Sequence, residues 1–354
     1  EPHMADSIKK SYHHVSFTLE PSLIHRLPEL VHRSLYQHRR SFVFGCDQGD
    51  VVEGMPSVRV SSHKAWVSIM YGCNNFCSYC IVPYVRGCER SRNSADIISE
   101  CRDLVAQGYK EITLLGQNVN SYKADMTFAQ LLETVANIPG DFVLRFMTSH
   151  PKDVSDELIE VFGKYSGKIA PTFHLPLQSG SDRVLKEMNR TYDTAKYLAT
   201  IDKIRAVVPN VALTSDIIVG FPGETDKDFE GTMNILERVR FDMVFSFIYS
   251  PREGTRAAKM ENQVSDEAKK SRMARLLDLQ CNISREKNDA YLGRVERVIV
   301  DDVENKNGID VYSARTSTNK LVHFECDENN IGKFVNVKIT RTGAFDLFGE
   351  IERN

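Results

Sequence analysis

The sequence lacks the features that mark membrane and secreted proteins. It has no run of about eighteen apolar residues, so no transmembrane helix is predicted. The first residues, EPHMADSIKK, are polar and do not form a secretory signal peptide. We therefore expect a cytoplasmic protein with no membrane partner. Because the chain does not begin with Met, we also expect it to be part of a longer protein.

An excess of basic charge is missing as well. The chain has 45 Lys and Arg against 48 Asp and Glu, a formal net charge of -3. Charge alone therefore does not predict binding to nucleic acid. The 8 cysteines are spread over 354 residues, unlike the dense cysteines of small disulfide-linked domains. In a reducing compartment, a tight group of cysteines is typical of metal or redox chemistry.

What the chain does contain is the repeated pattern of an α/β protein. Six short apolar runs between residues 65 and 250 are each followed by a polar turn and an amphipathic helix. They read AWVSIM, EITLLG, VLRFMT, TFHLPL, ALTSDIIVG and MVFSFIY. This alternation predicts parallel βα units. Because six units are too few for a complete eightfold barrel, we predict a partial (β/α)6 barrel of the TIM type.

The flanking segments differ from this pattern. Residues 1–58 predict a helix, a short strand and a second helix, with a linker from Phe42 onward. One long helix covers 265–290, and Ser265 is its predicted cap. From residue 291, short alternating strands separated by Asn/Gly turns predict a small all-β barrel. We therefore expect three parts, at 1–58, 59–290 and 291–354.

Three cysteines follow the first predicted strand directly, in YGCNNFCSYC. They are Cys73, Cys77 and Cys80, and the carboxyl ends of barrel strands are where such folds place their chemistry. Structural zinc generally needs four ligands, but no second cysteine pair follows, and Cys88 lies eight residues further on. Zinc and three unrelated core cysteines remain as alternatives. The interpretation that we favour is a 4Fe-4S cluster held by three thiolates, which leaves one iron open.

The spacing Cys73-x3-Cys77-x2-Cys80, with Tyr79 before the last cysteine, resembles the radical S-adenosylmethionine superfamily. Further segments are LLGQNVNSY, HLPLQSGSDRVLKEMNRTY, SDIIVGFPGET and YSPREGTRAA. Together they resemble the methylthiotransferases, most closely the MiaB-like branch that modifies tRNA. The resemblance implies that the three cysteines are catalytic and that the open iron binds S-adenosylmethionine. Reductive cleavage of its sulfonium would then yield a 5′-deoxyadenosyl radical.

The resemblance also implies where S-adenosylmethionine binds. Candidate contacts follow the second, fourth and fifth predicted strands, where glycines let the backbone come close and amide oxygens accept from an ammonium group. Plain turns and a helix cap at Ser181 are the alternatives, and Asp216 can instead orient a neighbouring side chain. The full set of candidates is Tyr79, Gly116, Gln117, Asn118, Gln178, Ser179, Asp216, Ile218 and Gly220.

RNA contacts are expected from two segments. Arg86, Arg90 and Arg92 flank the cysteine loop and can hold phosphates, although a solvated turn is an equal alternative. The C-terminal barrel resembles a TRAM domain, an RNA-binding module. Its candidate contacts lie in one polar loop and are Arg315, Asn319 and Lys320. Because acidic residues outnumber basic ones in this barrel, it is also possible to interpret it as a part that only packs on the catalytic domain.

The sequence departs from the family pattern at two places. The family carries an N-terminal domain whose three further cysteines bind a second, auxiliary cluster, whereas residues 1–58 resemble only its end. Cys46 has no matching partners there. Cys88 stands where a basic residue is usual. We therefore expect this chain to bind one 4Fe-4S cluster.

The resemblance implies a reaction at carbon 2 of N6-isopentenyladenosine at position 37 of tRNA, to which a methylthio group is added. The implied partners are the tRNA anticodon loop and an electron donor, and we expect a monomer. Two other functions stay open. One is methylthio transfer to a ribosomal protein or to threonylcarbamoyladenosine in tRNA. The other is a non-enzymatic, metal-containing RNA-binding module.

Overall fold

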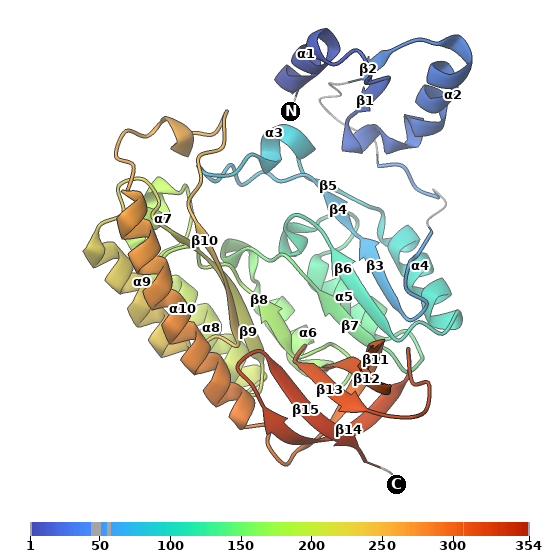
Figure 1. Ribbon diagram of the computed structural model, residues 1–354, viewed down its shortest axis with the longest axis vertical. Coiled ribbons are helices and arrows are strands. Elements are labelled where there is room, and N and C mark those ends of the chain that lie inside the picture. Colours follow the sequence, from blue (N-terminus) through green and yellow to red (C-terminus); the bar gives the residue numbers. More distant parts are fainter. Residues whose placement is uncertain (1, 44–50, 55–57, 307, 353–354) are drawn as a thin grey trace.

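The chain folds into three parts in the computed structural model, which describes residues 2–43, 51–54, 58–306 and 308–352. A small N-terminal unit and a closed β-barrel lie at opposite ends of a central open barrel (Figure 1). Cys46 lies outside the described residues.

The N-terminal unit contains one βαβ connection. It consists of α1 (Pro2–Ser11), β1 (Phe17–Leu19), η1 (Pro21–Arg26), α2 (Leu27–Gln37) and β2 (Ser41–Val43). β1 and β2 pair in parallel, and Leu30 of α2 is fully buried. The expected linker from Phe42 onward is therefore wrong at its start. A strand of three residues is too short to show the alternating pattern that identifies strands in a sequence.

Six parallel strands form the central sheet, in two groups of three. The groups are β3-β6-β7 and β8-β9-β10. Two backbone hydrogen bonds join them, from Leu144 N to Lys168 O (2.9 Å) and from Ala170 N to Leu144 O (2.8 Å). The predicted partial (β/α)6 barrel is thus confirmed. The strands are β3 (Lys64–Ser68), β6 (Glu111–Leu115), β7 (Val143–Phe146), β8 (Thr172–His174), β9 (Ala212–Val219) and β10 (Met243–Ile248).

Helices cover the outer face of this sheet because alternate strand residues point toward them. On β9, Leu213, Ile217 and Val219 belong to the main hydrophobic core, whereas Asp216 is only partly buried on the other face. The polar side chains are thereby left for the inside of the open barrel. The covering helices are α4 (Ser94–Ala106), α5 (Phe128–Ala136), α6 (Asp156–Lys164), α7 (Asp182–Glu187), α8 (Thr194–Val207) and α9 (Asp226–Val239).

Other segments of the chain contact both edge strands of the open sheet. At β3, Arg59 donates to Trp66 O (2.9 Å) and Arg92 donates to Ser68 O (2.6 Å). Glu100 accepts from both guanidinium groups. At the other edge, the long helix α10 (Asp266–Asp289) packs along β10 (Figure 1).

The C-terminal part is a closed five-stranded barrel in the order β11-β12-β13-β15-β14. Buried Val298, Tyr312, Val322 and Val337 belong to its own core. The predicted small all-β barrel is therefore confirmed. Its strands are β11 (Val295–Lys306), β12 (Ile309–Thr316), β13 (Leu321–Glu325), β14 (Phe334–Thr342) and β15 (Asp346–Ile351).

The turn between β12 and β13 attaches this barrel to the amino ends of the central strands. Arg145 of β7 donates to Thr316 O (3.0 Å) and Ser317 O (2.9 Å). Lys320 Nζ lies 3.3 Å from Asp242 Oδ1, just before β10. The candidate cysteines follow β3 at its carboxyl end. The cysteine loop and the β12–β13 turn therefore lie at opposite ends of the open barrel (Figure 1).

Replacing Arg145 by Ala is expected to destabilise the protein by about 3 kcal/mol. Arg145 Nε donates to Glu111 Oε2 (2.7 Å), and both side chains are buried, so the variant leaves a buried carboxylate supported by Lys64 alone at 3.6 Å. Urea unfolding measures the loss. R297A is the matched control, since it breaks the half-exposed pair with Asp141 and should cost less than about 1 kcal/mol. If R145A and R297A lose equal free energy of unfolding, the buried Arg145–Glu111 pair does not contribute more than an exposed pair.

Candidate functional site

The candidate cysteines lie in a loop between two short paired strands. β4 (Met70–Tyr71) and β5 (Arg90–Ser91) pair antiparallel, and the loop leads into α3 (Val82–Arg86). Its entry depends on Gly72, which has φ +75° and whose Cβ, if present, would lie 2.0 Å from Cys88 O. Cys73 N donates to Gly87 O (3.1 Å) across this approach. Only glycine fits here, so the loop geometry is set at this residue.

The three thiols form a suitable donor set for an iron–sulfur cluster. Cys77 is buried, and Cys73 and Cys80 are half-buried. Burial raises the pKa of Cys73 and of Cys80, and the neighbouring cysteine thiols raise both further. Among the described residues, no three His, Cys, Asp or Glu side chains surround one common ion position. In a 4Fe-4S cluster, each of the three thiolates would bind a different iron.

A turn more than a hundred residues away holds the loop in place. Ser78 N donates to Met188 O (3.0 Å), and Ser78 Oγ donates to Glu187 O (2.8 Å). Asn189, at φ 59°, donates through Nδ2 to Phe76 O (3.0 Å). The cysteine loop is therefore fixed by the end of α7, not by its own sequence alone.

Arg190, in the same turn, contacts a candidate ligand directly. Its Nη1 donates to Cys77 Sγ (3.4 Å), its Nη2 to Pro176 O (3.0 Å) and its Nε to Tyr192 Oη (2.9 Å). The ring of His150 packs edge-on against Tyr192, with centroids 5.7 Å apart. Sequence reasoning did not assign a role to Arg190 or His150. The segment MNRTY was a possible signal for Arg190, because it stands within a segment that carried the resemblance.

Buried polar atoms without partners surround the carboxyl ends of three strands. Gly116 follows β6, where a Cβ would lie 2.5 Å from Met70 Cγ, and Gln117 beside it is exposed. Four side chains in this region have atoms that lack a hydrogen bond within the described part of the chain. They are Asn118 (Oδ1), Asn120 (Oδ1 and Nδ2), Ser149 (Oγ) and Tyr249 (Oη). Since such groups cost about 1–3 kcal/mol each when unsatisfied, a polar ligand is well suited to this place.

The fourth and fifth strands bring further candidates together. Gln178, at φ 71°, donates from its backbone N to Asp216 O (2.8 Å) and accepts from Ile218 N (3.0 Å). The neighbouring Ser179 is fully buried. His174 Nε2 lies 3.7 Å from Asp216 Oδ2. In the alternative in which Asp216 orients a neighbouring side chain, that side chain would be His174.

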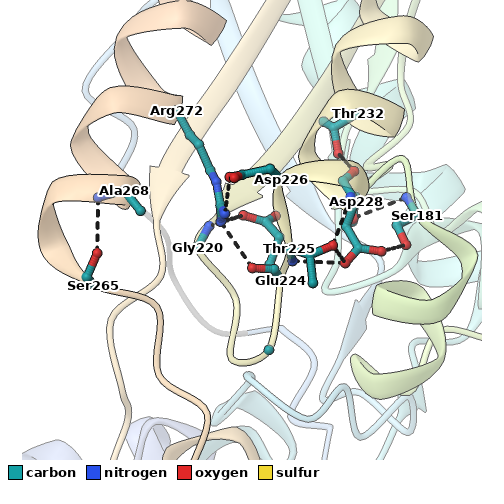
Figure 2. A network of polar contacts seen from close by, with 12 residues as sticks. Ser181, Gly220, Glu224, Thr225, Asp226, Asp228, Thr232, Ser265, Ala268 and Arg272 are labelled. Atoms are coloured by element: carbon teal, nitrogen blue, oxygen red, sulfur yellow. Dashed lines mark hydrogen bonds and ion pairs between the residues drawn. The ribbon is translucent and has the colours of Figure 1, made fainter.

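Gly220 begins a loop that is held by a network of charged groups (Figure 2). At φ +74°, its Cβ would lie 2.3 Å from Lys269 Cγ, and its N donates to Glu224 Oε2 (2.8 Å). Arg272 of α10 donates to the same oxygen (2.8 Å) and to Asp226 (2.7 Å). Burial raises the pKa of Glu224 against the effect of Arg272. α10 therefore fixes the loop that follows β9.

The same loop continues into a second group of contacts at the start of α9 (Figure 2). Asp228 accepts from Ser181 Oγ (2.5 Å) and from Thr225 Oγ1 (2.6 Å), and it pairs with Arg183. Burial acts to raise the pKa of Asp228, but these hydrogen bonds outweigh burial, so the pKa is lowered. Ser181 caps α7, as the simpler alternative predicted, and it links the loops after β8 and β9.

The candidate RNA-binding residues divide into accessible and engaged groups. Arg86 is exposed, and Arg90 is partly exposed. Arg92 is 9% exposed and is held by Glu53 and Glu100. Lys320 is equally buried beside Asp242. Neither Arg92 nor Lys320 is free to bind a phosphate, because both cations already have carboxylate partners.

Arg315, near the end of β12, and Asn319, in the turn that follows, differ from Lys320. Arg315 is partly exposed, with its Nε 3.8 Å from Asp301, and Asn319 is exposed at φ 64°. This turn packs on the central barrel through Thr316 and Ser317, and whether the C-terminal barrel only packs there or also binds RNA stays a prediction.

Known families match two segments of the chain. The radical SAM superfamily matches residues 67–236, and the TRAM domain matches residues 289–351. A tRNA-2-methylthio-N(6)-dimethylallyladenosine synthase from Clostridium botulinum is 48% identical over 351 residues, which cover 98% of this chain and 78% of that protein. The enzyme of the same name from Acetivibrio thermocellus is 49% identical over 358 residues, covering 100% and 74%.

Among solved structures, coproporphyrinogen III oxidase (HemN) from Escherichia coli, a radical SAM enzyme, matches with a TM-score of 0.48 and 13% identity. The match covers 73% of this chain and 67% of that chain. Within the described ranges, no helix is both long and apolar enough to cross a membrane.

Replacing Gly72 by Ala is expected to abolish cluster binding. The added Cβ would collide with Cys88 O at 2.0 Å and displace the loop that carries the thiols. Iron analysis after anaerobic reconstitution measures the loss. G108A is the matched control, because Gly108 has φ +90° but no atom within 4 Å of its Cβ position. It should cost about 1–2 kcal/mol in unfolding and retain full iron. A G72A chain with full iron would show that the loop tolerates the shift.

The stability of the chain is expected to depend on pH through His150. Burial, together with the charges of Arg190 and Lys152, lowers the pKa of His150 to about 2. Below pH 6.5, which is about the pKa of His150 in the unfolded chain, the unfolded chain binds a proton at His150 and the folded chain does not. Stability therefore falls as pH falls. Between pH 6.5 and 5 this amounts to about 2 kcal/mol.

H150N is expected to remove this part of the pH dependence. Asn can still accept from Lys152 N, as His150 Nδ1 does at 3.2 Å, but it does not titrate. Urea unfolding at the two pH values compares the chains. If the wild type and H150N lose equal stability on acidification, His150 is not the responsible group.

Proposed function

Because the chain belongs to the family of tRNA-2-methylthio-N(6)-dimethylallyladenosine synthases, we propose that it adds a methylthio group to tRNA. The proposed target is carbon 2 of N6-isopentenyladenosine at position 37, in the anticodon loop. The observation that carries the proposal is the single loop that presents Cys73, Cys77 and Cys80, together with unsatisfied polar atoms that follow β6, β7 and β10. The cofactors are a 4Fe-4S cluster and S-adenosylmethionine.

The chain's own residues have separate roles in this proposal. The three thiolates would hold the cluster, which when bound supplies the electron for cleavage of S-adenosylmethionine. Asn118, Asn120, Ser149 and Tyr249 offer donors and acceptors that a polar cofactor would satisfy. Gly116 and Gly220 let the side chains of Met70 and Lys269 pack close to the backbone at two strand ends, and both glycines remain proposed cofactor contacts. Gln178, Ser179, Asp216, Ile218 and Tyr79 remain proposed cofactor contacts.

The proposed RNA surface is smaller than the sequence predicted. It includes Arg86 and Arg90 near the cysteine loop, and Arg315 and Asn319 on the C-terminal barrel. Arg92 and Lys320 are left out because their charges are engaged within the protein. An anticodon-loop base is single-stranded, so it can leave the stack and enter a pocket. We further propose a monomer in the cytoplasm that receives its electron from a separate donor.

Replacing Cys77 by Ala is expected to remove both iron and activity. After anaerobic reconstitution, the wild-type chain should hold about four irons and form 5′-deoxyadenosine from S-adenosylmethionine and dithionite. C77A should do neither. C88A is the matched control, because Cys88 is exposed and lies outside the proposed ligand set, and it should behave as the wild type. About eight irons per chain would contradict the expectation of a single cluster.

The substrate is tested in cells. Deletion of the gene should remove the methylthio-modified adenosine from total tRNA, measured by mass spectrometry of nucleosides. The full-length wild-type gene should restore it, and a C77A gene should not. An unchanged methylthio-adenosine pool in the deletion strain would contradict the proposed tRNA substrate and favour a ribosomal protein as the substrate instead.

A further inference from the structure

Four arginines of the described chain are almost fully buried, and three of them have carboxylate partners. Arg92 pairs with Glu53 and Glu100, Arg145 with Glu111, and Arg272 with Glu224 and Asp226. The fourth is Arg190, which is 9% exposed. In the described ranges, no carboxylate lies within ion-pair distance of Arg190. Its hydrogen bonds go to Tyr192 Oη, Pro176 O and Cys77 Sγ.

A buried guanidinium without an anion is costly, since taking such a charge out of water costs several kcal/mol. The surrounding side chains do not supply the anion. Tyr79 and Tyr192 are phenols, whose ordinary pKa of about 10 makes them neutral at pH 7. His150 contributes no charge of either sign, because its pKa is lowered to about 2. The remaining candidate is the sulfur of Cys77, which is anionic when it binds iron.

We propose that Arg190 is a positioning residue for the cluster. Its guanidinium is the counter-ion of the Cys77 thiolate, and its charge and hydrogen bond raise the reduction potential of the cluster. This inference rests on the proposed function, because it requires a cluster at Cys73, Cys77 and Cys80. Hydrogen bonds to cluster sulfurs and net charge are two of the factors that set such potentials, and charge-assisted hydrogen bonds are the stronger kind.

The geometry suits this role because Arg190 is fixed from three sides. Pro176 O and Tyr192 Oη hold two of its nitrogens, and the third points at Cys77. Tyr192 Oη itself lies 2.9 Å from Leu177 O. A cation held in this way adds a constant positive charge beside one ligand. An added electron on the cluster is then stabilised, because the reduced cluster is more negative than the oxidised one.

The test is the midpoint potential of the reconstituted 354-residue chain, followed by EPR in a redox titration. R190Q removes the charge and should lower the ratio of reduced to oxidised cluster at fixed potential about tenfold, which is a downward shift of about 59 mV for one electron. R190K keeps the charge but cannot replace all three hydrogen bonds, so it should show a smaller shift in the same direction. R145K is the matched control, because Arg145 is an equally buried arginine that binds Thr316 O and Ser317 O of the C-terminal barrel, and it should retain the wild-type potential.

The outcomes separate this inference from the proposed function. A wild-type midpoint in R190Q overturns the role of Arg190, whether or not the wild-type chain modifies tRNA. If R190Q assembles no cluster, the midpoint potential of R190K is the deciding measurement. An R190K chain with the wild-type midpoint potential overturns the role of Arg190. A shift of the same size in R145K would also overturn it, because general loosening of the barrel would then explain the effect. Failure of the wild type to modify tRNA, with the Arg190 shifts intact, would count against the proposed substrate only.

Discussion

The contact between the cysteine loop and the turn after α7 is the interaction on which the site depends. Residues 187–190 hold Phe76, Cys77 and Ser78 through four hydrogen bonds, although more than a hundred residues separate the two segments. A loop with three thiols has little reason to keep one conformation by itself, since fixing each backbone residue costs about 1–2 kcal/mol. The turn supplies that constraint from the far half of the barrel, so the loop geometry depends on closure of the whole sheet.

Closure of the sheet in turn divides the molecule into two ends with different tasks. At the carboxyl ends of the strands lie residues at positive φ and buried polar atoms without hydrogen-bond partners. At the amino ends, Arg145, Lys320 and Asp242 are fully engaged in attaching the C-terminal barrel. α10 connects the two ends, because Arg272 holds the loop after β9 while Asn288 donates to Gly343 O in the barrel. Stability and chemistry are thus placed on different ends of the same strands.

The features that the sequence predicted are those encoded over short distances. Six apolar runs, a capped long helix and the Cys73–Cys80 spacing are all local, and the (β/α)6 barrel followed from them. Whether a cation is free or paired is a property of tertiary structure, however. Arg92 and Lys320 looked like RNA contacts in the sequence, yet both are buried and have carboxylate partners. Arg190 was overlooked for the same reason, because its partner Cys77 is 113 residues away in the chain.

The polar groups around Arg190 also explain why its charge dominates this side of the cysteine loop. Burial, and after it the guanidinium that faces Cys77, lowers the pKa of His150, so the imidazole remains neutral and its Nδ1 accepts from Lys152 N. Tyr79 and Tyr192 remain neutral because burial raises their pKa. None of these three neighbours therefore changes its charge between pH 5 and pH 8. A cluster ligand in this environment is held next to one fixed positive charge, and a buried site with fixed charges needs little reorganisation when an electron arrives.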